Sequence, residues 1–581
     1  MPLITHNELF QSFVENLVFS SAKTTKYLTM IPWILLILLM LMYCIALPQL
    51  LKRAGHKMPW LGYIPVVQFI PVLQVLKHPV WYFVVILCPG VNLLMLIVIN
   101  VELGIAFGKR TFRNQWFFGA LPWYALIKLA FQEKELPFLG PRDWTKTKKS
   151  SQREWGEAIL FAVIAASLIR TFFIEAFTIP TPSMENSMLV GDYLFVSKVS
   201  YGAKIPQTPM SIPFLHNAIP NESMTNSYVD WFSLPYYRLP GLGKVERFDP
   251  VVFNYPHGDT IIVDPFLAGH DYYEILRREA MTLAARDAKL PLSAPESYTY
   301  YLSKQEEYLN KARIQFRDKK ACLSCANDIK RHGGVRPRPM DKKENYVKRC
   351  IGLPGETIEI KDHVVHINGQ PIQDPEGVMY NYIITCGTAE QFNGVIKRMN
   401  VAPSNIQMIS GNRALIPFTQ ADANTVKELG GVQEFKLYVD SLQEENRMAM
   451  FPNLPKEPYN HWTVDNFGPL HIPYQGETIE LTQDNVDLYR HTIVNYEGNT
   501  LEQRDGKVYL NGAEATTYTF KQDYYWMMGD NRHHSVDSRF WGWVPEDHIV
   551  GKPVFTWFSK NQQGHNHSTS VRWNRVFRLV N

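Results

Sequence analysis

The sequence has few cysteines and no excess of charge of either sign. Only 6 of its 581 residues are cysteine, too few for a disulfide scaffold, and Cys44 and Cys88 lie in apolar runs. The 59 basic and 55 acidic residues nearly balance, whereas capture of nucleic acid needs clustered lysine and arginine. Repeats of fixed period and low-complexity tracts are also absent. A disulfide-rich domain, a nucleic-acid partner and a repeat protein are therefore excluded.

Charged residues are missing from two long runs in the first third of the chain. Tyr27 to Leu51 exceeds the roughly 30 Å of a bilayer core at about 1.5 Å per residue, and this run predicts a spanning helix. Pro79 to Val101 is also uncharged but carries Pro89 and Gly90 at its centre. It predicts either one kinked helix or a re-entrant pair.

Two weaker apolar stretches lie near these runs. Met58 to Leu76 contains three prolines, which favours an interfacial segment over a span. Gln115 to Phe131 is short and includes Lys128, so it is a weak candidate span. No short hydrophobic segment with a small-residue cleavage site precedes these runs, which argues against a cleaved signal peptide at the N-terminus.

The run from Ala158 to Phe177, interrupted by Arg170, permits two interpretations, a buried helix of a soluble domain or a membrane span. The preceding segment is rich in lysine and arginine, which marks a cytoplasmic flank. We therefore expect a helix that runs outward, with Arg170 snorkelling near its outer end and the remaining chain outside the cytoplasm. The total expected is three to five spans.

Two motifs follow this run. Phe177-Thr-Ile-Pro-Thr-Pro-Ser-Met184 holds Ser183 in a rigid extended segment, because prolines fix the backbone on both sides of Thr181. In Tyr346-Val-Lys-Arg-Cys350 the strand alternation places Lys348 and Arg349 on opposite faces. A lysine turned into apolar surroundings has a lowered pKa and can act as a general base near neutral pH.

The third motif, Tyr524 to Arg539, combines aromatic residues with a dense set of opposite charges after a Gly-Asp-Asn turn. Such charges more often form a buried scaffold than catalyse. His533 and His534 are adjacent, but no metal-ligand spacing such as H-E-x-x-H accompanies them. We expect no metal site and no cofactor.

Together with Arg247-Phe-Asp-Pro-Val-Val-Phe253, these motifs stand in the order found in bacterial type I (leader) signal peptidases, and the sequence closely resembles that family. The resemblance implies a serine–lysine endopeptidase with Ser183 as nucleophile and Lys348 as general base. Thr181 matches an oxyanion-hole position, together with the Ser183 N–H, and Ser535 matches a hydroxyl that orients the lysine. The other matched positions are substrate-pocket walls (Phe177, Ile179, Pro180, Met184, Val347), structural ion pairs (Arg349 with Asp530, Asp537 with Arg539) and residues that desolvate the lysine (Phe253, Met527).

The sequence departs from the family pattern at three places. Where the family commonly has Ser-Met-x-Pro-Thr-Leu, this chain has Ser183-Met-Glu-Asn-Ser-Met188, so Met188 would reshape the floor of the first pocket. His533 and His534 stand where acidic or amide residues are usual. More apolar runs precede the anchor than the one or two spans common in the family.

The expected fold is a set of N-terminal α-helical transmembrane segments followed by a mostly antiparallel β extracytoplasmic catalytic domain. This domain carries an inserted second β-rich domain and a helical insertion. The insertion is expected to be a surface helical hairpin, and Cys322 and Cys325 are candidates for a local disulfide. Val364 to Gly369 and Lys507 to Gly512 predict hairpins that turn at Asn-Gly. The expected boundaries are 1–154 (polytopic membrane region), 155–177 (anchoring helix), 178–265, 344–370 and 506–581 (catalytic core), 266–343 (helical insertion) and 371–505 (second β-rich domain).

The resemblance favours removal of signal peptides from exported preproteins at the outer face of the cytoplasmic membrane. The implied partners are preprotein signal peptides, the lipid bilayer and the secretion machinery. Trp231, Phe232, Trp557 and Phe558 are candidates for membrane-interface anchors or for core positions. The alternatives are a self-cleaving Ser–Lys peptidase of the repressor type, against which the apolar runs count, and a non-catalytic membrane scaffold, against which the intact trio of Ser183, Lys348 and Ser535 counts.

Overall fold

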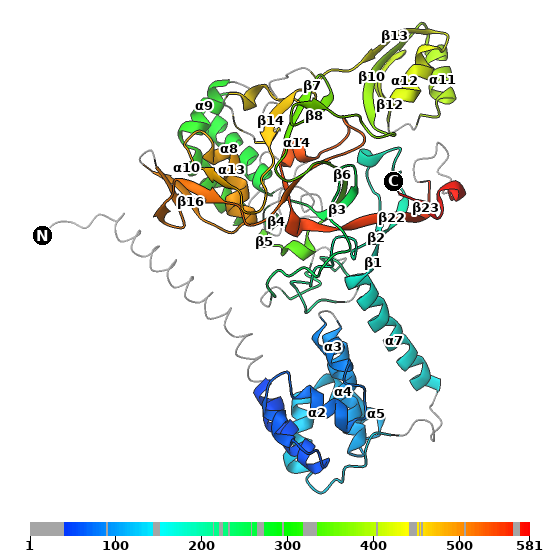
Figure 1. Cartoon of the computed structure of the whole chain (residues 1–581), viewed down its shortest axis with the longest axis vertical. Coiled ribbons are helices and arrows are strands. Elements are labelled where there is room, and N and C mark those ends of the chain that lie inside the picture. Colours follow the sequence, from blue (N-terminus) through cyan, green and yellow to red (C-terminus); the bar gives the residue numbers. More distant parts are fainter. Residues whose placement is uncertain are drawn as a thin grey trace, which may run out of the picture. The chain divides into compact units, whose positions relative to one another are not determined.

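The structure is a computed structural model, drawn in Figure 1. It describes residues 40–88, 91–142, 151–212, 214–219, 225–229, 233–256, 258, 260–263, 272–292, 295–317, 334–401, 405–440, 450–452, 454, 457–504, 507–561 and 570–580. Cys322, Cys325, Trp231 and Phe232 lie outside these residues, so the expectations placed on them have no structural counterpart. The chain divides into two compact units. The first comprises Met1–Leu168, Thr208–Leu215 and Ser227–Pro235, and the second comprises Ile169–Gln207, His216–Asn226 and Tyr236–Asn581.

The first unit is a group of short helices around one apolar core. Arg53, at the end of a helix over 40–53, donates hydrogen bonds to the carbonyls of Leu129, Glu133 and Leu136 and so ties the first helix to the last. The other helical segments are η1 (Pro59–Tyr63), α2 (Phe69–Val75), α3 (Tyr82–Leu87), α4 (Asn92–Ala106), α5 (Phe112–Ala120), α6 (Pro122–Ile127) and η2 (Lys128–Gln132).

Among the described residues, one helical stretch is long and apolar enough to cross a membrane, Glu154–Phe172 within α7 (Ser151–Phe172). The predicted runs at 79–101 and 115–131 are broken into shorter helices, and residues 27–39 of the first predicted span lie outside the described residues. The predicted end of the anchoring helix at Phe177 is wrong. The chain leaves the helix at Phe172 because residues from Ile174 onward pair with a neighbouring strand, with Phe177 opposite Leu194.

The second unit is built on an eight-stranded sheet in which every pair of strands is antiparallel, as predicted for the catalytic domain. The strand order is β1-β2-β22-β3-β6-β20-β21, and β23 pairs with β22. The strands are β1 (Ile174–Thr178), β2 (Asp192–Ser197), β3 (Pro250–Asn254), β6 (Asn345–Gly352), β20 (Tyr524–Met528), β21 (Val544–Pro545), β22 (Ile549–Ser559) and β23 (Arg578–Leu579).

The C-terminal segment is fastened to this sheet by a buried ion pair. Arg575 Nη2 lies 2.6 Å from Asp192 Oδ2, and Asp192 is fully buried. The same guanidinium donates to the carbonyl of Ser187, at 3.1 Å. Ser187 lies in the turn that follows Ser183, so the end of the chain holds the segment that carries the predicted nucleophile.

The predicted second β-rich domain over 371–505 is not one domain. Buried residues from Met450 onward pack with Ile358, Val365 and Trp526 in a single hydrophobic core. The strands around this core are β7 (Thr357–Lys361), β8 (Val364–Ile367), β9 (Gln370–Pro371), β14 (Phe467–His471), β15 (Thr478–Glu480), β16 (Leu501–Arg504), β17 (Lys507–Leu510), β18 (Ala513–Glu514) and β19 (Thr517–Thr519). Both predicted hairpins are confirmed, because Ile367 pairs with Gln370 and Leu510 with Ala513 across positive-φ Asn-Gly turns.

Between Met379 and Leu437 the chain forms a separate layered module with its own core. Its sheet has the order β11-β12-β10-β13, and two helices contribute Phe392, Val395, Ala423 and Val426 to the core beside the sheet. The elements are β10 (Met379–Cys386), α11 (Ala389–Arg398), β11 (Gln407–Ser410), β12 (Arg413–Thr419), α12 (Gln420–Lys427) and β13 (Val432–Leu437). We call residues 379–437 the inserted module.

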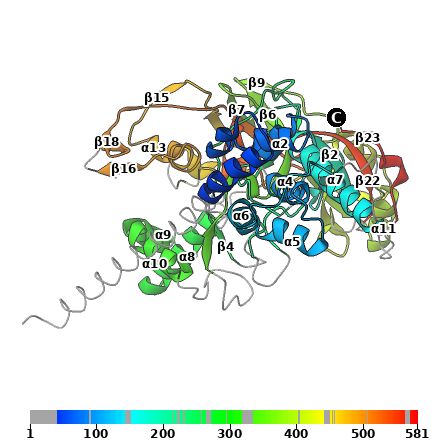
Figure 2. The ribbon, with the colours of Figure 1, turned by 90° about the horizontal axis from the view of Figure 1, so that it is seen from below.

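The described residues of the insertion predicted as a helical hairpin form three helices. Tyr272, Tyr308 and Phe316 are buried in a core that these helices share with Ile262 of β4 (Thr260–Ile262). The two views in Figures 1 and 2 show the three helices side by side. They are α8 (Tyr272–Ala288), α9 (Pro295–Ser303) and α10 (Gln305–Arg317).

Candidate active site

Ser183 lies in a single helical turn, Pro182–Met184, that follows the extended segment after β1. Pro182 stands at the start of this turn, where its missing N–H costs nothing. Ser183 itself is 7% exposed. Asn531 donates its backbone N–H to the Ser183 carbonyl, at 3.1 Å, and its side-chain amide to the Pro182 carbonyl, at 3.3 Å. The turn is therefore fixed by the loop that follows β20.

Lys348 lies on β6, between β3 and β20 in the sheet, and its Nζ is 2.5 Å from Ser183 Oγ. The predicted alternation is present, because Lys348 shares a face with Tyr346 and Cys350, and Arg349 points elsewhere, to Asp530. Val251 of β3 is the direct cross-strand neighbour of Lys348. The sheet thus brings the amine and the hydroxyl together from positions 165 residues apart.

Burial sets the charge state of this amine. Lys348 is 2% exposed, and Phe253 and Met527, the two residues predicted to desolvate it, are fully buried in the core cluster on its face of the sheet. Loss of solvation lowers the pKa of Lys348 to about 8, although the negative charges of Asp537 and Asp530 act in the opposite direction. Near neutral pH a usable fraction of the amine is therefore unprotonated.

Both predicted ion pairs are present and buried beside the lysine. Arg349 binds Asp530 through two contacts of 2.8 Å, and Ser187 also donates to this carboxylate, at 2.5 Å. Arg539 binds Asp537 in the same two-pronged way. Burial alone would raise the pKa of Asp537, but the contacts with Arg539 and the N–H of Gly529 lower it below its usual value.

The two predicted accessory hydroxyls differ in their surroundings. Thr181 is exposed, and its Oγ1 lies 3.5 Å from Ser183 Oγ. The hydroxyl of Ser535 is buried and has no hydrogen-bond partner among the described residues, so its role in orienting Lys348 stays a prediction. The absence of a side chain at Gly529 allows the loop after β20 to approach the turn of Ser183. A Cβ at this position would lie 2.2 Å from Ser535 Oγ and 2.6 Å from the Ser183 carbonyl oxygen.

The predicted pocket walls fall into two adjoining apolar clusters. Ile179, Met184 and Met188 form one with Leu194, and Phe177 belongs to the other, while Val347 contacts both. Pro180 is exposed. Met184 and Met188 are fully buried, so they support this surface from beneath.

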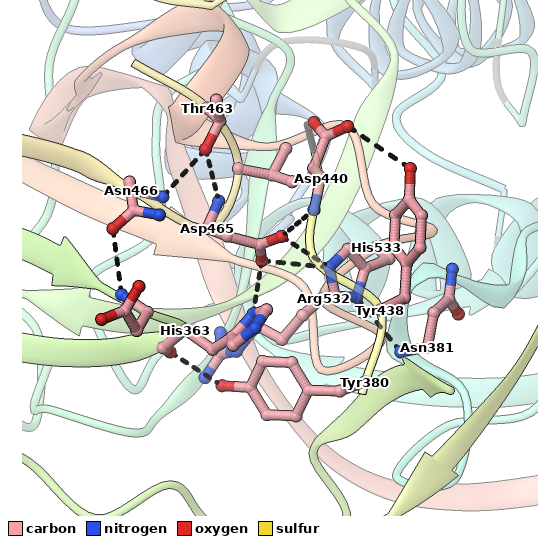
Figure 3. A network of polar contacts seen from close by, with 12 residues as sticks. His363, Tyr380, Asn381, Tyr438, Asp440, Thr463, Asp465, Asn466, Arg532 and His533 are labelled. Atoms are coloured by element: carbon pink, nitrogen blue, oxygen red, sulfur yellow. Dashed lines mark hydrogen bonds and ion pairs between the residues drawn. The ribbon is translucent and has the colours of Figure 1, made fainter. Parts of the chain in front are cut away.

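The structure also forms a polar cluster that the sequence did not predict (Figure 3). The carboxylate of Asp465 lies 2.7 Å from His363 Nδ1 and 3.0 Å from His533 Nε2. These three side chains are close enough to be considered as metal ligands. They stand 102 and 68 residues apart, respectively, which leaves no local motif to reveal the cluster.

Hydrogen bonding argues against a metal in this cluster. The backbone N–H of Asn381 donates to His533 Nδ1, at 3.1 Å, so a neutral ring carries its proton on Nε2 and points it at Asp465. A metal would need the Nε2 lone pair instead. The cluster is therefore a hydrogen-bonded group in which one carboxylate accepts from two histidines.

Comparison with family models gives two matches. One, described as signal peptidase, peptidase S26, covers residues 152–415 and 471–558, which is more than half of the chain. The chain belongs to the signal peptidase S26 family. This confirms the predicted resemblance. The second model, a family of unknown function (DUF5684), matches residues 60–141.

Several curated relatives are called signal peptidase I. The chain is 25% identical over 238 residues to that of Buchnera aphidicola subsp. Acyrthosiphon pisum, covering 41% of this chain and 56% of the relative. With the protein of Buchnera aphidicola subsp. Baizongia pistaciae it is 20% identical over 420 residues, covering 71% and 79%. With that of Rickettsia massiliae it is 43% identical over 117 residues, covering 20% and 36%. The chain thus spans little more than half of the first relative's length.

The buried lysine predicts a measurable effect on stability. The unfolded chain keeps an ordinary lysine pKa of about 10.4, so between pH 8 and 10.4 it binds more protons than the folded chain, and stability rises with pH in that window. Replacing Lys348 by Met removes the cost of burying the amine and should stabilise the protein at pH 7 by about 3 kcal/mol. Chemical unfolding of parent and variant in detergent at several pH values measures the difference. Equal pH dependence in the two proteins would contradict the lowered pKa.

Proposed function

We propose that the protein is a membrane-anchored serine endopeptidase that removes N-terminal signal peptides from exported preproteins, cleaving after small residues with Ser183 and Lys348. The observation that carries this proposal is the 2.5 Å approach of a buried, readily deprotonated amine to a serine hydroxyl, in a chain of the signal peptidase family. A serine hydroxyl is a weak nucleophile until a neighbouring base takes its proton, and a neutral lysine is sufficient.

The reaction follows from the positions of these groups. Neutral Lys348 accepts the Ser183 proton as Oγ attacks the scissile carbonyl, and the N–H of Ser183 with the hydroxyl of Thr181 stabilises the oxyanion. The protonated lysine then gives its proton to the leaving amine, which departs with the mature protein. Water, deprotonated by Lys348, hydrolyses the acyl-enzyme and releases the signal peptide.

The apolar clusters around Val347 suit the substrate. Two of their half-buried members are Phe177 of β1 and Val347 of β6, so an extended peptide can lie beside the nucleophile with small side chains against this surface. Fully buried Met188 fills the space beneath and limits the depth available to the residue before the cleaved bond.

Substitution of the two central residues tests the proposal directly. Ser183→Ala and Lys348→Met should each lower the rate of cleavage of a preprotein with an Ala-x-Ala site by at least about a thousandfold. The two residues act as a unit, so removal of either one abolishes their joint contribution to catalysis. The matched control is Lys361→Met, an exposed lysine on β7. Gel analysis and mass spectrometry of the product check both rate and cleavage position. Cleavage that survives either substitution would show that the pair is not catalytic.

An inert parent protein, tried on several preproteins, would favour the scaffold alternative instead.

The pH dependence of cleavage tests the identity of the base. Because the neutral amine is the active form, kcat/KM should rise with pH and level off above an apparent pKa of about 8. Below that value it should fall about tenfold per pH unit. Steady-state rates on a peptide substrate measured from about pH 6 to about pH 9 provide the profile. A flat profile over this range would exclude a lysine base.

Membrane attachment rests on two observations. The apolar stretch Glu154–Phe172 has none of its most apolar window buried. The first unit also exposes many large apolar side chains, among them Trp60, Trp81, Phe112 and Trp116. Exposed apolar surface of this extent is typical of lipid contact. We propose that α7 spans the cytoplasmic membrane and that the first unit adds further lipid contacts and crossings.

Chemical labelling tests the proposed orientation. In intact bacterial spheroplasts, a membrane-impermeant maleimide should label Lys397→Cys, exposed on α11 of the second unit. Arg142→Cys, on the predicted cytoplasmic side, should be labelled only after permeabilisation. The parent protein gives the background from its own cysteines. Protection of Lys397→Cys in intact spheroplasts would reject an extracytoplasmic catalytic domain.

A further inference from the structure

The loop from Gly529 to Ser535, which we call the clamp loop, holds both members of the Ser183–Lys348 pair. Asn531 fixes the turn of Ser183 through two hydrogen bonds to the Pro182 and Ser183 carbonyls. Asp530 binds Arg349, the residue next to Lys348 on β6. A shift of this loop would therefore change the distance between the serine and the lysine.

The clamp loop is itself held by the inserted module. Met379, the first residue of β10, donates its N–H to the Asp530 carbonyl, at 2.8 Å, and accepts from the N–H of Arg532, at 3.0 Å. These bonds flank a parallel bridge between Met379 and Asn531. The side chain of Arg532 also reaches Asp374, at 2.6 Å. The first residue of the module thus pairs with the loop through backbone hydrogen bonds, as a neighbouring strand would.

His533 anchors the loop on two sides (Figure 3). Its Nδ1 accepts from the backbone N–H of Asn381 in β10, and its Nε2–H donates to Asp465, which precedes β14. The side chain is 4% exposed and packs edge-on against Tyr380 and Tyr438, at 6.0 and 5.6 Å between ring centres. An imidazole can accept on one ring nitrogen and donate from the other, in fixed directions.

Asp465 is a fixed point for this anchor. It accepts from His363 in the turn between β7 and β8, from the N–H of Asp440 after β13, and from His533. Burial alone would raise the pKa of Asp465, but these donors lower it far below its usual value, so the carboxylate stays ionised. Three separate chain segments therefore meet at one charged group.

We propose that His533 and Asp465 are positioning residues for the Ser183–Lys348 pair, acting through Asn531 and Asp530 of the clamp loop. The inference rests on the proposed peptidase function. It makes the inserted module part of the catalytic machinery. It also gives a role to the histidine at a position where the family resemblance leads one to expect an acidic or amide residue. The imidazole offers an acceptor to the Asn381 N–H and a donor to Asp465, and an ionised carboxylate has no such donor.

Four variants test this inference. His533→Phe keeps the packing against Tyr380 and Tyr438 but removes both polar contacts, and Asp465→Asn removes the charge on the other side. The double variant shows whether the two act as a unit. His534→Gln is the matched control, because His534 is adjacent and its side chain makes no hydrogen bond or ion pair with the described residues.

The expected results separate positioning from a contribution to stability alone. His533→Phe and Asp465→Asn should each lower kcat by at least about tenfold with KM changed by less than about twofold, and the double variant should be no worse than either. The apparent pKa of the rate profile should rise from about 8 towards 10.5, because a loosened loop lets water reach Lys348. A residue important only for stability would lower the melting temperature and leave kcat and this pKa unchanged in the folded protein.

A second measurement does not depend on cleavage. Competitive acetylation of Lys348, followed by mass spectrometry over a pH range with Lys361 as internal reference, reports the pKa of Lys348 even if no substrate is cut. Should His533→Phe fail to fold, His533→Asn, which keeps an acceptor towards Asn381, replaces it in both measurements. Unchanged kcat and unchanged Lys348 pKa in a folded variant would overturn the inference. A parent protein that cleaves no substrate but whose acetylation profile gives the expected lowered pKa of Lys348 would overturn only the proposed function.

Zinc titration of the parent protein tests the remaining alternative, that the His363, Asp465 and His533 cluster binds a metal ion. Binding of one equivalent of Zn²⁺ that is lost in Asp465→Asn would require a free Nε2 lone pair on His533 and would overturn the inference.

Discussion

An amine held out of water beside a serine hydroxyl is the constraint on which the rest of this structure depends. Burial disfavours the charged form of Lys348, but two carboxylates lie near enough to favour it. Each carboxylate is bound by its own arginine, Asp530 by Arg349 and Asp537 by Arg539. Desolvation is the largest effect on the pKa of Lys348, and the nearby Arg539 guanidinium also opposes the two carboxylates. A dense set of charges thereby permits a neutral base.

The sheet and the segments outside it hold different parts of this arrangement. The strands β3, β6 and β20 fix the lysine and its apolar surroundings, whereas the serine lies on a short turn with little structure of its own. That turn is restrained from one side by Asn531 and from the other by Arg575, which binds the Ser187 carbonyl. The clamp loop and the C-terminal segment therefore restrain the same short segment, the loop at the Pro182 and Ser183 carbonyls and the C-terminal segment at the Ser187 carbonyl.

Local signals in the sequence predict the chemistry better than the architecture. The prolines around Thr181 and the alternation around Lys348 predict the local surroundings of Ser183 and Lys348, and Asn-Gly predicts both hairpins. The end of the anchoring helix is different, since strand pairing at Phe177 outweighs an apolar run. The single domain expected over 371–505 is wrong because its second half shares a core with β7 and β20. The group around Asp465 depends on three distant segments, which no local pattern encodes.

The long range of these contacts has a consequence for biogenesis. Pro182 and Asn531 are separated by 349 residues, and Ser187 and Arg575 by 388. A chain that emerges from its N-terminal end therefore presents the serine long before the segments that restrain it. Under the proposed orientation, a partly exported molecule has no assembled site with which to cut itself or its neighbours. Under the same proposal, the turn of Ser183 acquires its restraints only after the segments that carry Asn531 and Arg575 have been exported and have docked.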